Sequence, residues 1–169
     1  MTSVETRRYP ESARDVFAWY GAAMHAAQFF EGDLITLHLT ARARNNGGGT
    51  LSDVRGWEDL VSRHTLGRLL KEMEGLVQVS PHVRETWEKA LAARNRLAHS
   101  YFWSHFEQLS ASEAHEDLVI GLQGDALLFS EAAAAARDLV EHLIPLLGIE
   151  PNTWIAALQE EFERLRDGA

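Results

Sequence analysis

The sequence contains no cysteine among its 169 residues. Disulfide bridges and cysteine-ligated zinc sites are therefore excluded, and the composition is compatible with a reducing compartment. The chain also has no run of 18 or more apolar residues, and residues 1–8 lack the apolar segment of a secretory signal. These absences lead us to expect a cytoplasmic protein that does not enter a membrane.

Positive charge is also scarce. Sixteen Lys and Arg residues stand against 25 Asp and Glu residues, which gives a formal net charge of −9. Proteins that grip long nucleic acids mainly through phosphates usually have basic surfaces. Any contact with RNA would therefore be local, at a small cationic patch surrounded by acidic surface.

Alternation typical of β-strands is rare, whereas apolar residues recur at helical spacing along almost the whole chain. The hydrophobic fraction of 46% is average for a globular protein, and the length fits one domain covering residues 1–169. We predict an all-α fold, a single-domain up-and-down bundle of four or five helices.

Helical periodicity divides the chain into five predicted helices. Their predicted ranges are 10–41, 57–74, 81–106, 128–147 and 152–166. Between the third and the fourth, residues 107–127 are ambiguous. Ser110 or Ser112 suits the cap of a short helix there, whereas Gly121 and Gly124 favour a break. The expected buried face of the first helix comprises Phe17, Tyr20, Met24, Ala27, Leu34 and Leu37.

Several residues are typical of helix ends. Ser80 followed by Pro81 predicts a helix start, because serine accepts an unpaired N–H and proline fits the first helical position. Thr65 is a candidate cap inside the second helical region, and Gly75 is a candidate cap at its end. Gly32 is a candidate break in the first helix, while Pro145 should kink or end the fourth.

The segment that carries chemistry is Arg94-Asn95-Arg96-Leu97-Ala98-His99-Ser100-Tyr101, inside the third predicted helix. On a helical wheel Arg94 and His99 lie about 140° apart, and the small Ala98 lies between them. This spacing predicts a groove with a polar floor. Asn95 is four residues from His99, so its amide is placed to hold the imidazole.

Arginine and histidine together suit metal-independent cleavage of RNA. The guanidinium of Arg94 matches a phosphate, and His99 can exchange a proton near neutral pH. Cleavage by this route needs two proton-transfer groups, and one copy of the segment supplies only one. A symmetric homodimer with the third helices facing each other would supply two arginines and two histidines.

The segment resembles the signature of the HEPN superfamily, an Arg followed by a polar residue and then a His after four to six intervening residues. Four residues intervene here, and Asn95 fills the polar place. The resemblance implies a helical bundle that dimerises around the motif helix. Enzymes of this superfamily are metal-independent ribonucleases, often in toxin–antitoxin or phage-defence systems.

Tyr101, two residues after the histidine, is similar to the pattern of HepT-type toxins. That likeness implies a nucleotidyltransferase-type antitoxin as a partner, which modifies the tyrosine matching Tyr101. The segments 65–70 and 93–99 also resemble sequences in a group of uncharacterised bacterial HEPN-like proteins. The chain departs from the HepT pattern by an additional C-terminal helix and by the aromatic run Tyr101-Phe102-Trp103.

The leading hypothesis is therefore a HEPN-type endoribonuclease that needs no cofactor. Arg94 and His99 would be catalytic, Asn95 would assist, and Tyr101 would be a point of control. Arg96 lies roughly opposite Arg94 on the wheel, which suits a solvated charge or a group that steers RNA. The main alternative is a noncatalytic dimeric module in which Arg94 and His99 join helices and the protein binds a protein or nucleotide partner.

A metal-dependent enzyme is a third hypothesis. The sequence has eight histidines but no His-x-x-His, His-x-x-x-His or His-Glu-x-x-His pair. Six histidines on different predicted segments could still come together around a metal ion in the folded protein. They are His25, His38, His64, His99, His105 and His142. The glycine-rich segment 45–50 lacks the Lys-Ser/Thr ending of a phosphate-binding loop, so we interpret it as a connector.

Overall fold

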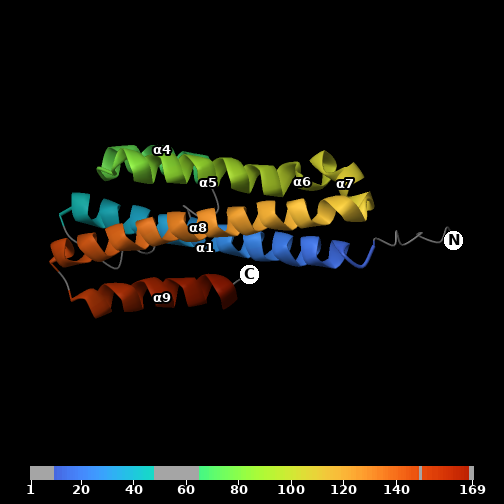
Figure 1. The fold of residues 1–169 in the computed structure, drawn as a ribbon. Coiled ribbons are helices and arrows are strands. Elements are labelled where there is room, and N and C mark those ends of the chain that lie inside the picture. Colours follow the sequence, from blue (N-terminus) through green and yellow to red (C-terminus); the bar gives the residue numbers. More distant parts are fainter. Residues whose placement is uncertain (1–9, 48–64, 149, 168–169) are drawn as a thin grey trace.

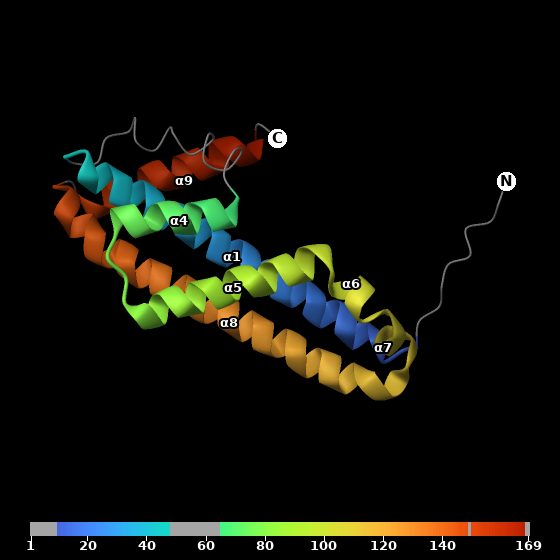
Figure 2. The ribbon, with the colours of Figure 1, turned by 90° about the horizontal axis from the view of Figure 1, so that it is seen from above.

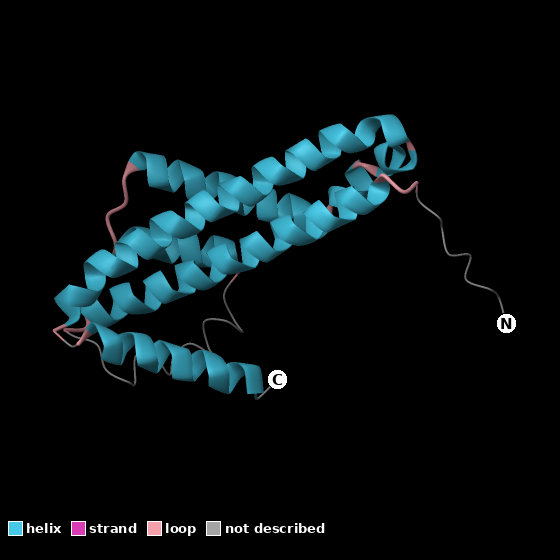
Figure 3. Cartoon of the chain, turned by 60° about the horizontal axis from the view of Figure 1, so that its bottom comes forward, coloured by secondary structure: helices cyan, strands magenta, loops and turns pink. Residues whose placement is uncertain are grey.

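The computed structural model describes residues 10–47, 65–148 and 150–167, and every regular element among them is a helix (Figure 3). This confirms the predicted all-α fold. The longer helices are α1 (Ala13–Asn45), α4 (Leu66–Leu76), α5 (Pro81–His99), α8 (His115–Leu143) and α9 (Pro151–Asp167). Shorter pieces are α6 (Tyr101–Ser104), α7 (Phe106–Ser110) and the 3₁₀ turns Ser112–Ala114 and Ile144–Leu147.

The helices form three layers. The long helices α1 and α8 lie side by side in the middle, α4 and α5 cover one face of this pair, and α9 covers part of the other (Figures 1 and 2). Contacts between side chains give the directions. Ser12 meets His115 and Asp33 meets Arg137, so α1 and α8 run parallel. Helices α4, α5, α8 and α9 alternate in direction, whereas α1 and α4 run the same way.

The predicted helix start at Ser80 is confirmed, and Thr65 is a cap as predicted, although at the start of a helix and not inside one. Thr65 Oγ1 accepts a hydrogen bond from the backbone N–H of Arg68 at 3.4 Å, and Ser80 Oγ accepts one from Val83 at 3.3 Å. Thr65 caps the true beginning of α4. The predicted residues 57–64 before it lie outside the described residues. The predicted cap at Gly75 is wrong, because α4 continues to Leu76 and the extended Val77 follows it.

Glycines that were predicted to break helices do not break them. Gly32 lies inside the continuous α1, and Gly121 and Gly124 lie inside α8, which begins at His115 rather than near residue 128. Each internal glycine costs roughly 1 kcal/mol relative to alanine. Burial of Leu118 and Leu122 on the same helix offsets that cost.

The buried His115 fixes the start of α8. Its Nε2 donates a hydrogen bond to the carbonyl of Leu109 at 3.1 Å, and its Nδ1 accepts one from Ser12 Oγ at 2.7 Å. The ring thereby joins the ends of α1, α7 and α8. At the other end of α8 the prediction for Pro145 is confirmed, since the helix gives way to a 3₁₀ turn there.

The third predicted helix is interrupted. Instead of running to residue 106, α5 ends at His99, Ser100 leaves the helical conformation with φ −134° and ψ −10°, and α6 and α7 follow. Ser100 Oγ donates to the carbonyl of Arg96 at 3.2 Å, a local bond that competes with the helical ladder. The break turns the segment after the motif toward the start of α1.

The core lies between α1, α5 and α8, where Phe30, Leu34, Leu97 and Phe129 are almost completely buried. The predicted buried face of α1 is confirmed for Ala27, Leu34 and Leu37 and wrong for Phe17, which is 37% exposed. Tyr20 and Met24 are partly buried and pack against the core. The first turns of α1 have fewer neighbours because α9 covers only the far end of the bundle (Figure 1).

One helical stretch, Ser112–Leu147, is long and apolar enough to count as a candidate membrane span, with a mean hydropathy of 1.3 over its best window. It contains all of α8. Two of its charged residues pair with neighbouring helices, Asp125 with Arg96 and Arg137 with Asp33. A core helix of a water-soluble bundle has the same length and composition.

Candidate functional site

Helix α5 presents the predicted site on the outside of the bundle. Its inner stripe of Trp87, Ala90, Ala93 and Leu97 is buried. The Trp87 indole also donates to the carbonyl of Ala132 at 3.0 Å, which fixes α5 on α8. Helix α5 therefore belongs to an outer layer, with one face in the core and the other in solvent.

Asn95 and His99 lie on the exposed side of α5. Their four-residue spacing puts them on the same face of the helix. No hydrogen bond between these two described side chains is present, so the predicted support of the imidazole by the amide is not seen. What the structure provides is an accessible imidazole beside an accessible amide.

Arg94 is directed to the seam between α5 and α1. Its Nη2 lies 3.6 Å from Glu31 Oε2, and both side chains are 29% exposed. The distance is that of an ion pair and exceeds that of a hydrogen bond. Arg94 and His99 thus flank the outer face of α5, as the wheel predicts, and within one copy they do not share a single face.

Arg96 is engaged with α8. Its Nη2 donates to both oxygens of Asp125, at 2.6 and 2.7 Å. The arginine side chain is 46% exposed and the aspartate only 13%. Arg96 therefore links α5 to α8. If Arg96 attracts RNA, it does so while its guanidinium is paired with Asp125.

Tyr101 is buried, with 4% of its surface exposed. Its ring packs against Tyr20 and His105, with centroid distances of 5.4 and 4.5 Å. The hydroxyl is inaccessible to solvent and has no hydrogen-bond partner among the described residues. Burial, together with the nearby carboxylate of Asp125, raises the pKa of Tyr101 to about 12. In this conformation a modifying enzyme cannot reach the hydroxyl.

The metal hypothesis gains no support. Within residues 10–47, 65–148 and 150–167, no three His, Asp or Glu side chains come together to hold a metal ion. His105 Nδ1 instead donates to the carbonyl of Tyr101 at 2.8 Å, and His38 Nε2 lies 3.2 Å from Glu72 Oε2. Another of the six candidates, His64, lies outside the described residues.

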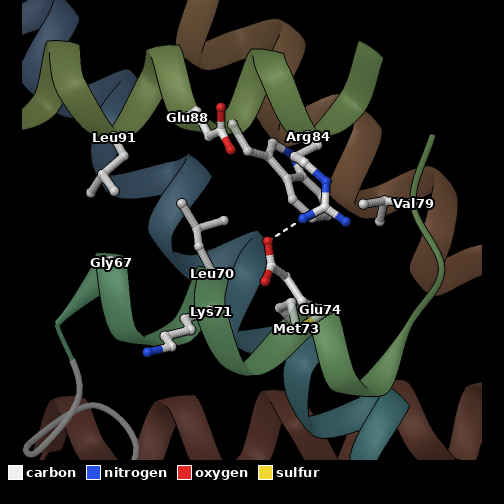
Figure 4. Close-up of a pocket in the computed structure, with 10 residues that line it drawn as sticks. Gly67, Leu70, Lys71, Met73, Glu74, Val79, Arg84, Glu88 and Leu91 are labelled. Carbon is white, nitrogen blue, oxygen red and sulfur yellow. Dashed lines mark hydrogen bonds and ion pairs between the residues drawn. The ribbon is translucent and has the colours of Figure 1, made fainter. Parts of the chain in front are cut away.

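A cleft of about 320 Å³ between α4 and α5 was not predicted (Figure 4). Leu70, Trp87 and Leu91 line its interior, and an ion pair between Arg84 and Glu74 crosses its mouth. None of the predicted site residues lines it. The strong segregation of apolar residues on one face of 66–76 was the signal that this short helix covers a neighbour.

Comparisons with protein-family models, with curated proteins and with solved structures find no match for this chain. The resemblance to the HEPN superfamily therefore rests on the residues of the 94–101 segment.

Proposed function

We propose that this protein is a metal-independent endoribonuclease of the HEPN type, acting as a homodimer whose two α5 helices face each other. The observation that carries the proposal is the placement of Asn95 and His99 on the free outer face of α5, with Arg94 at its edge. A helix in the outer layer can meet its own copy across a two-fold axis without any change in the core.

The chemistry assigns one role to each side chain. His99 of one copy removes the proton from a ribose 2′-hydroxyl, whose oxygen then attacks the adjacent phosphorus. The bond from phosphorus to the 5′ oxygen breaks, and His99 of the other copy donates a proton to that oxygen. The products are a 2′,3′-cyclic phosphate and a 5′-hydroxyl. General acid–base catalysis of this kind contributes roughly 10²–10⁴-fold.

Arg94 stabilises the negative charge that grows on the phosphorane oxygens. A guanidinium has five N–H donors, and the contact with Glu31, at 3.6 Å, is longer than a hydrogen bond. Donors of Arg94 therefore stay available for a phosphate, and the 29% exposure of the side chain leaves a route to it. Asn95 assists as a neutral hydrogen-bonding group on the same face as His99.

The net charge of −9 restricts the substrate. A small cationic slot on an acidic protein suits single strands or loops of RNA better than long duplexes. We also propose a cytoplasmic toxin or defence effector in a two-gene system, with a nucleotidyltransferase-type antitoxin as its partner. Control through Tyr101 would require α6 to lift from α1, because the hydroxyl is buried.

Cleavage of a mixed RNA in the presence of EDTA tests the proposal. We expect cleavage by the unmodified protein and at least about a 100-fold loss in Arg94→Ala and in His99→Ala. Matched controls are His82→Ala and Lys89→Ala, which remove an exposed imidazole and an exposed cation from the same helix. Both should cleave normally. Equal activity of all four variants, or activity that EDTA abolishes, would refute the proposal.

The second candidate is a noncatalytic dimeric helical module that binds a protein or nucleotide partner. The ion pairs of Arg94 with Glu31 and of Arg96 with Asp125 favour it, because both give the motif arginines a structural task. This candidate predicts no cleavage and an intact dimer in the Arg94 and His99 variants. Toxicity on expression that His99→Ala relieves would favour the nuclease.

A further inference from the structure

Trp103 is the most exposed large apolar side chain among the described residues. It leaves 83% of its surface in solvent, whereas Trp87 and Trp154 are buried at 3% and 2%. A large aromatic side chain with one face open is typical of binding surfaces, where its flat ring provides contact area at low entropic cost. Trp103 is the fourth residue after His99 and lies on α6.

The surface beside this indole forms a wide, open depression of about 620 Å³. Its lining combines two aromatic rings with three polar side chains. The lining residues are Trp103, Ser104, Phe106, Glu107 and Gln108. No lysine or arginine is among them, so the depression does not suit a phosphate group.

The lining contains the kinds of groups that contact nucleobases. Every base has a flat π-face that stacks on an aromatic ring, and this interaction accepts all four bases. The polar rim then discriminates among the bases. An ionised carboxylate such as that of Glu107 only accepts hydrogen bonds. Guanine offers it two adjacent donors, its ring N1–H and its exocyclic amino group, which match the two carboxylate oxygens.

We propose that the depression formed by α6 and α7 is a stacking subsite for an unpaired base of single-stranded nucleic acid, with Trp103 as the platform and Glu107 conferring a preference for guanine. Its role in RNA cleavage rests on the proposed function, whereas binding of the base does not.

The subsite lies close to His99. Trp103 is the fourth residue after His99, so their Cα atoms are at most about 14 Å apart even in a fully extended chain. The backbone N–H of Ser104 bonds to the carbonyl of Ser100 at 2.9 Å, which shows that the intervening segment is coiled and shorter still. A single strand of a few nucleotides is long enough to span this separation.

The polar lining favours a base over another protein. Interfaces between proteins bury contiguous apolar cores, but three of the five residues lining this depression are polar. The competing hypothesis is that Trp103 anchors a contact between two copies of the protein, and the binding experiment distinguishes the two.

Short single-stranded DNA oligomers test the subsite without cleavage, because they lack the 2′-hydroxyl that the proposed reaction needs. One oligomer carries a single guanine among thymines, and the matched oligomer contains thymine only. We expect the full-length protein to bind the guanine oligomer about tenfold more tightly, measured by fluorescence anisotropy. Trp103→Ala should weaken binding of both oligomers about tenfold, while Trp103→Phe should retain most of it.

Glu107→Gln should remove the guanine preference and leave binding of the thymine oligomer unchanged. Trp19→Phe, on α1, is the control and should bind like the unmodified protein. Equal binding of the two oligomers, or unchanged binding by Trp103→Ala, would overturn the subsite. A Trp103→Ala variant that no longer dimerises but still binds both oligomers normally would also overturn the subsite. The expected binding pattern without RNA cleavage would uphold the subsite and refute the nuclease.

Discussion

Arg94 Nη2 lies 3.6 Å from Glu31 Oε2, and the two side chains are equally exposed. The contact joins α5 to α1 across 63 residues of sequence. It holds the guanidinium at the edge of the outer face of α5 that borders α1. Glu31 therefore both anchors Arg94 and reduces its effective positive charge.

Glu31→Gln should strengthen binding of RNA, because Arg94 loses its counter-charge. Partly exposed ion pairs contribute about 0–1 kcal/mol, so we expect KM to fall by up to about fivefold and stability to change by less than about 1 kcal/mol. Steady-state cleavage of a labelled RNA and urea unfolding measure the two quantities. Glu85→Gln, which removes the exposed partner of Lys89 on α5, is the control. Indistinguishable KM values for the two variants would contradict this role for Glu31.

The absence of cysteine makes the proposed dimer directly testable. Residues near a two-fold axis meet their own copies, and a disulfide forms only when Cα atoms lie about 4.4–6.8 Å apart. Ala98 is exposed on α5, between Arg94 and His99 on the helical wheel. Ala98→Cys should give a covalent dimer on oxidation, whereas Ala22→Cys, exposed on α1, should stay monomeric on a denaturing gel. Equal yields for the two variants would place the dimer contact elsewhere.

Local chemistry made part of the fold predictable. Thr65 and Ser80 satisfy N–H groups within three residues of themselves, so their caps are readable from the sequence. The helical periodicity likewise predicted the all-α class. Glycine misled the prediction at Gly121 and Gly124, because the free energy of burying Leu118 and Leu122 comes from contacts that a local pattern does not contain.

The site residues on α5, Arg94 to His99, lie where the helical wheel puts them, but their partners were not predictable. The wheel separates Arg94 from Arg96, and the structure directs one to α1 and the other to α8. Glu31 and Asp125 are distant in sequence, so only the packing of helices reveals these pairs. The sequence shows Trp103 only as part of an aromatic run. Its exposure was not predictable, because it depends on the break at Ser100.

Tyr101→Phe should remove a dependence of stability on alkaline pH. The pKa of Tyr101 is about 12 in the folded protein and about 10 in the unfolded chain. Above pH 10 the unfolded state loses this proton and the folded state keeps it, so the free energy of unfolding falls as pH rises toward 12. Between pH 9 and pH 11, ionisation of this tyrosine in the unfolded state lowers the free energy of unfolding by about 1 kcal/mol.

Urea unfolding of both proteins at pH 9 and pH 11 measures that difference. The variant should also be at least as stable as the unmodified protein at neutral pH, since it no longer buries a hydroxyl without a partner. A Tyr101→Phe variant that loses stability at pH 7 would show that the hydroxyl is bonded.

Arg96 and Asp125 should prove to be coupled in a double-mutant cycle. The Asp125 side chain is only 13% exposed, so Arg96→Ala leaves a largely buried carboxylate without its cation. We expect Arg96→Ala to lower the free energy of unfolding by about 1–3 kcal/mol, and the loss to shrink by about 1 kcal/mol when Asp125→Ala is also present. Urea unfolding of the four proteins gives the coupling, and Arg84→Ala, whose partner Glu74 is exposed, is the control. Additive losses together with a raised KM for RNA would mean that Arg96 serves the substrate and not the contact between α5 and α8.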